Sequence, residues 1–182
     1  MRKISFGWML LCILCLILTG FLCIWKNGEV LFAKIGEKPE DTATAFFRLL
    51  REGNSAQAEE LLISSYPVSL QTEELSEEAR LLLNALRGSY ECSLSGTGRQ
   101  RGDTANLTVL LTRLDVTAAN KAATAAAKSG MTYINALQSV LADCSSYLTS
   151  DILTVNCRIE DGVWKIIPDE AFLTALRGGL NG

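Results

Sequence analysis

Residues 152–177, ILTVNCRIEDGVWKIIPDEAFLTALR, carry the clearest structural pattern in this chain. Apolar and polar side chains alternate over 152–160, as they do in a β-strand that buries one face. The Asp-Gly pair at 161–162 is a strong signal for a tight hairpin turn, and 163–167 then returns as the partner strand. The helical spacing of apolar residues over 170–177 predicts a closing helix. A hairpin followed by a helix predicts an α+β fold with an antiparallel sheet.

A second hairpin is predicted upstream of this stretch. Residues 89–98 and 104–115 both alternate between apolar and polar side chains, and a polar turn over 99–103 separates them. In the second of these strands, Leu110 has the opposite phase from the other apolar residues. These two segments therefore extend the predicted sheet.

Helical patterns fill most of the remaining sequence. Apolar residues recur at helical spacing over 39–52, over 54–65 and over 72–87. The alanine-rich segment 117–147 is predicted to be helical as well, with a break or kink at Gly130. The predicted order is three helices, a hairpin, an inserted helix, a second hairpin and a short closing helix.

An uncharged apolar segment near the start of the chain predicts a transmembrane helix. Residues 6–25 form a run of 20 without a charge, and a helix of that length spans about 30 Å, the thickness of the hydrocarbon core. Arg2 and Lys3 precede it, so the positive-inside rule puts the N-terminus in the cytoplasm. The stretch after it has no A-x-A-like cleavage site, which favours an uncleaved signal anchor over a cleaved or lipidated leader.

This interpretation divides the chain into four parts and places it in the cell membrane as a single-pass protein. The predicted parts are a cytoplasmic N-terminus at 1–5, the anchor at 6–25, a juxtamembrane linker at 26–36 and an extracytoplasmic domain at 37–182. The lipid bilayer is then the partner of the anchor.

Composition excludes several classes of function. The chain has no histidine, which removes the Ser-His and Cys-His pairs of nucleophilic catalysis. Residues 37–182 hold 19 acidic and 13 basic residues, a net charge of −6 that argues against nucleic acid as a partner. No spacing suggests a metal site. We therefore predict no catalytic, cofactor-binding or metal-binding residues and no cofactor.

Three cysteines, Cys92, Cys144 and Cys157, lie beyond the anchor. Three is an odd number, so they form at most one internal disulfide, and three buried thiols are the simpler expectation.

Three motifs resemble a known family. They are TATAFFRLLREGNSAQAEELL at 42–62, NLTVLLTRLDVTA at 106–118 and IEDGVWKIIPDEAFLTALRGGL at 159–180. Together they resemble the extracytoplasmic NTF2-like (cystatin-like) domains of membrane-anchored Gram-positive bacterial proteins, many of them of unknown function. The chain departs from that pattern in its leader, which does not look lipidated, and in the insert at 117–148.

The resemblance implies a curved antiparallel sheet packed on helices around a cone-shaped apolar cavity. Such cavities host ligands, enzymatic sites or protein contacts, so the fold does not choose among them. Four residues are candidates to line this cavity: Phe47, Tyr90, Met131 and Trp164.

The favoured function is a non-enzymatic protein-interaction or assembly module of the cell envelope, which binds a protein partner or itself. The alternative is a small-ligand binder that uses the cavity. An isomerase- or hydrolase-like enzyme is the third hypothesis, for which Asp103, Asp115 and Tyr90 are the only candidates on strands or at strand ends. Asp115 is better explained as the cap of the helix that follows it.

Overall fold

A computed structural model describes residues 36–66, 68–70, 75–96 and 98–178. The chain divides into two compact units, Met1–Ile35 and Gly36–Gly182. The predicted anchor at 6–25 lies outside the described residues. Among the helices of the described part, none combines the length and the apolar character needed to cross a bilayer.

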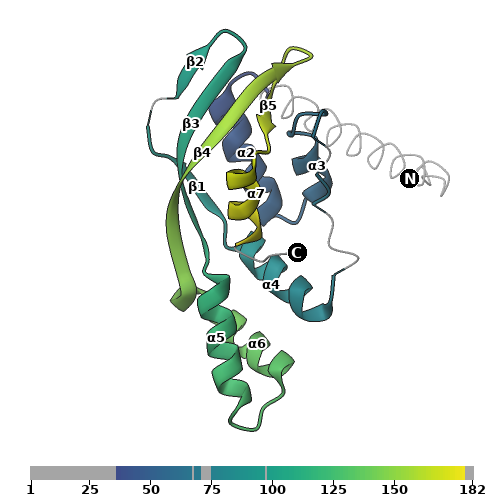
Figure 1. Cartoon of the computed structure of the whole chain (residues 1–182), viewed down its shortest axis with the longest axis vertical. Coiled ribbons are helices and arrows are strands. Elements are labelled where there is room, and N and C mark those ends of the chain that lie inside the picture. Colours follow the sequence, from purple (N-terminus) through teal and green to yellow (C-terminus); the bar gives the residue numbers. More distant parts are fainter. Residues whose placement is uncertain (1–35, 67, 71–74, 97, 179–182) are drawn as a thin grey trace, which may run out of the picture. The chain divides into compact units, whose positions relative to one another are not determined.

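The second unit is built on one antiparallel sheet (Figure 1). Its strands are β1 (Glu91–Leu94), β2 (Arg99–Arg101), β3 (Thr104–Leu114), β4 (Leu148–Glu160) and β5 (Val163–Ile167). The strand order is β1-β3-β4-β5, and β2 pairs with the beginning of β3. The α+β class and the two hairpins are therefore confirmed.

Two sequence predictions about the strands were wrong in detail. Arg99–Arg101 is not part of a turn, because it pairs with the beginning of β3 as strand β2. The turn is confined to 102–103, where Gly102 has a φ of +59°, a conformation that glycine adopts without steric cost. β4 begins at Leu148 rather than at residue 152, because β3 offers it a partner as far as Leu114.

Six α-helices and a 3₁₀ turn complete the described part of this unit. Their bounds are α2 (Pro39–Arg51), α3 (Ser55–Glu59), α4 (Glu77–Gly88), α5 (Val116–Ala127), α6 (Tyr133–Ala142), η1 (Cys144–Tyr147) and α7 (Glu170–Arg177).

The predicted helix over 117–147 is broken into separate pieces. Gly130 has a φ of +102° in the connection between α5 and α6. The Thr132 side chain then accepts a hydrogen bond from the N–H of Asn135 and starts α6 as its N-cap. The break expected at Gly130 is confirmed, and it lets α6 fold back on α5 at the end of the sheet (Figure 1).

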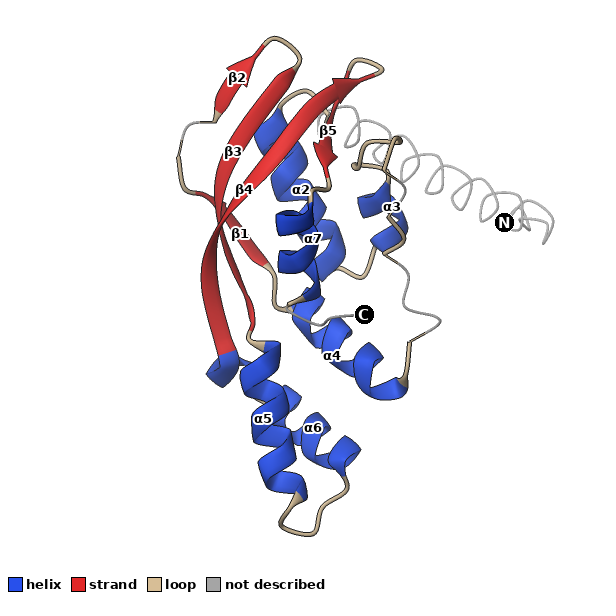
Figure 2. Cartoon of the chain, in the orientation of Figure 1, coloured by secondary structure: helices blue, strands red, loops and turns tan. Residues whose placement is uncertain are grey.

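Among the described residues, helices cover one face of the sheet and leave the other free (Figure 2). Along β3 the burial alternates strictly from Thr104 to Val109, with every second residue buried. The buried residues face α2 and α7, whose rings form an aromatic cluster at the centre of the core: Phe46, Phe47 and Phe172, with Tyr90 beside them. The sheet therefore has an inner face in the core and an outer face in solvent.

Candidate functional site

The outer face of the two long strands is the most distinctive surface of the described residues. We define it by four pairs of residues in register on β3 and β4: Asn106–Asn156, Thr108–Thr154, Leu110–Ile152 and Thr112–Ser150. None of the eight side chains is charged. At the centre lie Leu110, 38% exposed, and Ile152, 72% exposed.

Polar pairs on the outer face hold the surface on either side of this apolar centre. The Asn106 amide donates a hydrogen bond to Oδ1 of Asn156. The hydroxyls of Thr112 and Ser150 are hydrogen-bonded at 2.8 Å. Because these side chains satisfy one another across the strands, the face is ordered before any partner arrives.

The exposed apolar pair is costly in water. Fully burying a large aliphatic side chain yields about 1.5–3 kcal/mol, and Ile152 keeps 72% of its surface in solvent. Burial of Leu110 and Ile152 under another protein surface would therefore be favourable.

The four predicted lining residues are divided between the core and the surface. Phe47, Tyr90 and Trp164 are buried, whereas Met131 is 46% exposed in the connection between α5 and α6. The structure brings Phe47 and Tyr90 together, with ring centroids 5.6 Å apart. Surface hollows of about 680 Å³ on α5 and about 530 Å³ beside β5 have none of the four in their walls. Their role as the lining of a ligand cavity remains a prediction.

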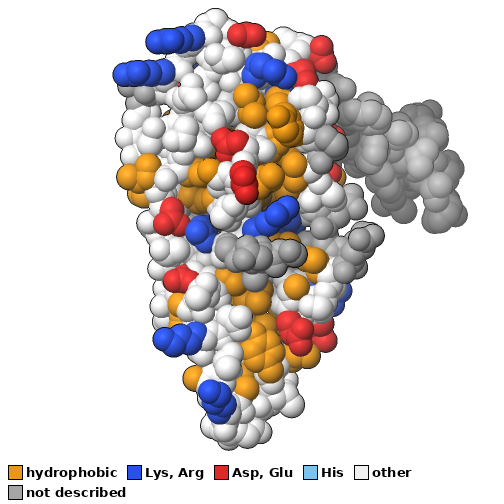
Figure 3. Space-filling view, in the orientation of Figure 1, with side chains coloured by type: hydrophobic (Ala, Val, Ile, Leu, Met, Phe, Trp, Pro, Cys, Tyr) orange, Lys and Arg blue, Asp and Glu red, His pale blue; other side chains and the backbone are white. Residues whose placement is uncertain are grey.

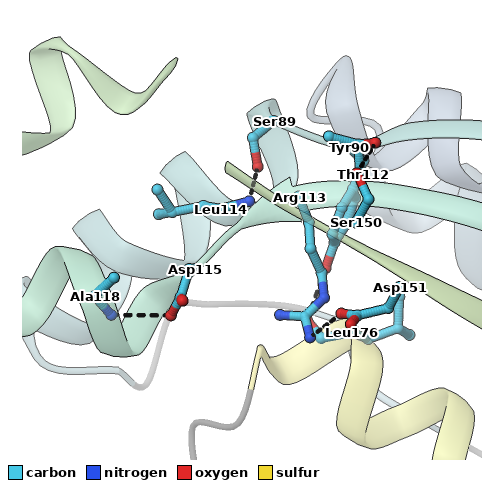
Figure 4. A network of polar contacts seen from close by, with 10 residues as sticks. All are labelled: Ser89, Tyr90, Thr112, Arg113, Leu114, Asp115, Ala118, Ser150, Asp151 and Leu176. Atoms are coloured by element: carbon cyan, nitrogen blue, oxygen red, sulfur yellow. Dashed lines mark hydrogen bonds and ion pairs between the residues drawn. The ribbon is translucent and has the colours of Figure 1, made fainter. Parts of the chain in front are cut away.

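Tyr90 belongs to a polar network at the edge of the core (Figure 4). Its hydroxyl donates to the carbonyl of Leu176 at 2.7 Å. Burial raises the pKa of Tyr90 far above its ordinary value, so the phenol stays protonated at neutral pH. In this network the hydroxyl ties the residue before β1 to the end of α7, and its hydrogen bond is donated to a backbone carbonyl.

The same network contains the salt bridge between Arg113 and Asp151, whose Nη2 and Oδ2 atoms are 2.8 Å apart. The Nε of Arg113 is buried and donates to no described acceptor. A buried N–H without an acceptor costs about 1–3 kcal/mol.

Of the two aspartates weighed as catalytic candidates, one caps a helix and the other is exposed in a turn. Asp115 accepts a hydrogen bond from the N–H of Ala118 at 2.9 Å as the N-cap of α5, which confirms the capping interpretation (Figure 4). Asp103 is exposed in the turn between β2 and β3. In the part of the chain that the structure describes, no three His, Cys, Asp or Glu side chains are placed to hold a metal ion.

The cysteines beyond the predicted anchor are free thiols, but only Cys157 is buried. The expectation of three buried thiols was wrong for Cys92 and Cys144, which are partly exposed. Burial raises the pKa of Cys157 to about 12 and that of Cys92 to about 11. A thiol with such a pKa has very little thiolate at pH 8, and the thiolate is the nucleophile.

We therefore expect iodoacetamide at pH 8 to alkylate Cys92 and Cys157 at least about 100-fold more slowly in the folded chain than in urea. Peptide mapping by mass spectrometry after timed alkylation measures both rates. Alkylation of Cys157 in the folded chain at the rate seen in urea would show that it is not held in the core.

Comparison of the chain with family models, with curated proteins and with solved structures finds no match.

The outer face was not among the functional surfaces predicted from the sequence. Its signal is nevertheless present, because Leu110 and Ile152 are apolar at positions where the alternation of their strands requires a polar residue. Their pairing in register could not be deduced from either strand alone.

Proposed function

We propose that the chain is a non-enzymatic protein-interaction module of the cell envelope, anchored in the membrane through residues 6–25 and presenting its α+β domain outside the cytoplasm. One observation supports the interaction role above all others. No helix of the described part covers the outer face, its eight defining side chains are uncharged, and Ile152 and Leu110 are exposed on it side by side. An exposed apolar pair on an ordered sheet face is typical of a surface that binds protein.

The inner face supports a structural role rather than a catalytic one. Tyr90 is protonated and hydrogen-bonded to backbone, and Asp115 is occupied as a helix cap. The NTF2-like assignment and the position of the anchor belong to the same proposal, since they rest on the sequence motifs and on the apolar segment.

A charge at the centre of the outer face tests this function. We expect Ile152→Asp to abolish the complex that the full chain forms in its native membrane, because burial of a carboxylate without a partner is strongly unfavourable. Native gel electrophoresis of mildly solubilised membranes, probed for the chain, measures the size of the complex. The wild type is expected above the position of the monomer, and the variant at that position.

Met131→Asp is the matched control, because Met131 is also an exposed apolar residue but lies between α5 and α6. It is expected to leave the complex intact. A monomeric wild type, or equal loss in both variants, would contradict the proposed function.

A further inference from the structure

The outer face continues beyond its apolar centre into a basic end. Arg101, Thr104 and Arg158 lie in one row across β2, β3 and β4, and Arg99 lies opposite Asn106 in the next row. These residues share the phase of the exposed positions of β3. Figure 3 shows Lys and Arg side chains projecting at the end of the domain where Figure 1 places β2.

Among the described residues no hydrogen bond or ion pair joins Arg99, Arg101 or Arg158 to an acceptor, and Arg158 interacts only through its charge with Glu160, whose pKa it helps to lower. The salt bridge found among the described residues joins Arg113 and Asp151 instead. The nearby Glu160 carboxylate is occupied, since it accepts hydrogen bonds from the N–H of Ser64 at 3.0 Å and from its hydroxyl at 2.8 Å. Arg99, Arg101 and Arg158 are thus available to bind an anion.

A role in protecting the sheet edge does not account for all three arginines. Charged side chains on a short edge strand discourage the pairing of one sheet with another, which would explain Arg99 and Arg101 on β2. Arg158, however, lies on β4 between β3 and β5, where no edge needs protection. Beside the two edge arginines, Thr104, Asn106 and Thr108 complete the wall of a hollow of about 500 Å³.

The apolar centre alone is too small for a specific interface. Four residue pairs on two strands cover an area of about 20 Å by 10 Å, whereas a stable interface buries about 800 Å² on each partner. A partner that covers Leu110 and Ile152 must therefore extend along the strands, and the basic end is the adjoining part of the same face.

We propose that the partner is an acidic segment of another protein, whose carboxylates bind Arg99, Arg101 and Arg158 while an apolar part covers Ile152. This inference rests on the proposed function and names the chemistry of its partner. The charges are complementary, because guanidinium groups form paired hydrogen bonds with carboxylates. Six residues along β3 separate the basic row from the apolar pair, a distance of about 20 Å that an extended segment of six residues spans.

The experiment uses photocrosslinking from the full chain in its native membrane. One photoreactive residue replaces Ile152 and reports on the apolar centre, and a second replaces Thr104, which lies in one row with Arg101 and Arg158, for identification of the bound material. The arginines are then changed together as Arg99→Gln, Arg101→Gln and Arg158→Gln. We expect at least a tenfold loss of crosslinking from position 152 and a weaker dependence of crosslinking on salt than in the wild type.

The matched control changes three exposed cations elsewhere, as Arg80→Gln, Lys121→Gln and Lys128→Gln. It removes the same charge and is expected to crosslink as the wild type does. Unchanged thermal unfolding of both triple variants shows that they remain folded.

The material crosslinked at position 104 decides the chemistry of the partner. A peptide rich in Asp and Glu from another protein supports the proposal when the arginine variant also loses it. A lipid adduct, a phosphate polymer or a peptide of this same chain would overturn it. Unchanged crosslinking from position 152 in the arginine variant would overturn this inference alone, whereas no crosslinking from position 152 in any chain would contradict the proposed function itself.

Discussion

Val155→Lys is expected to unfold the domain, whereas Thr154→Lys is expected to change its free energy of unfolding by no more than about 0.5 kcal/mol. Val155 is 0% exposed on the inner face, opposite Leu107, and its neighbour Thr154 is exposed on the outer face, opposite Thr108. A lysine at 155 would bury an ammonium group without a partner, which costs several kcal/mol. A lysine at 154 keeps its charge in water.

Urea denaturation of a fragment comprising residues 36–182, followed by circular dichroism, measures both variants. The comparison tests the register of β4 directly, since a shift by one residue exchanges the two faces of a strand. Equal loss of stability in the two variants would show that both faces of β4 are covered.

Phe47→Ala is expected to lower the free energy of unfolding by about 3–5 kcal/mol, a large part of the stability of an ordinary domain. Phe47 is 1% exposed, and its ring centroid lies 5.4 Å from that of Phe46 and 6.0 Å from that of Phe172. Removing the ring leaves a cavity between α2, α7 and β1 that these rigid aromatic neighbours cannot fill.

Thermal unfolding of the same fragment measures this loss, expected as a fall in Tm of about 10 °C or more. Phe47→Leu is the control, and it should keep more than half of the lost stability because it refills much of the cavity. A fall of less than about 1 kcal/mol for Phe47→Ala would show that the aromatic cluster is not the centre of the core.

The sequence predicted most of the strands because their burial follows a period of two. The Asp-Gly turn at 161–162 and the alternation over 152–160 were sufficient to place β5 and the part of β4 from residue 152 onward. Helix caps could be predicted equally well from the sequence, as Asp115 shows. These features depend on neighbours along the chain, and a single sequence contains that information.

Features that depend on pairing between distant residues could not be predicted in the same way. Strand β2, with the sequence RQR, has no apolar residue and is ordered by β3. The outer face arises because Leu110 and Ile152 meet in register, 42 residues apart in the chain. Its basic end likewise needs β2, β3 and β4 side by side, which no local pattern reveals.

Crosslinking from the two exposed apolar sites of the full chain tests the central claim most directly. The claim is that the uncovered face of β3 and β4 is where this protein binds another. With a photoreactive residue at position 152 or at position 131, crosslinked protein should form in intact cells from position 152 and not from position 131. Crosslinks from position 131 alone, or none from position 152, would show that this face of β3 and β4 is not the binding surface.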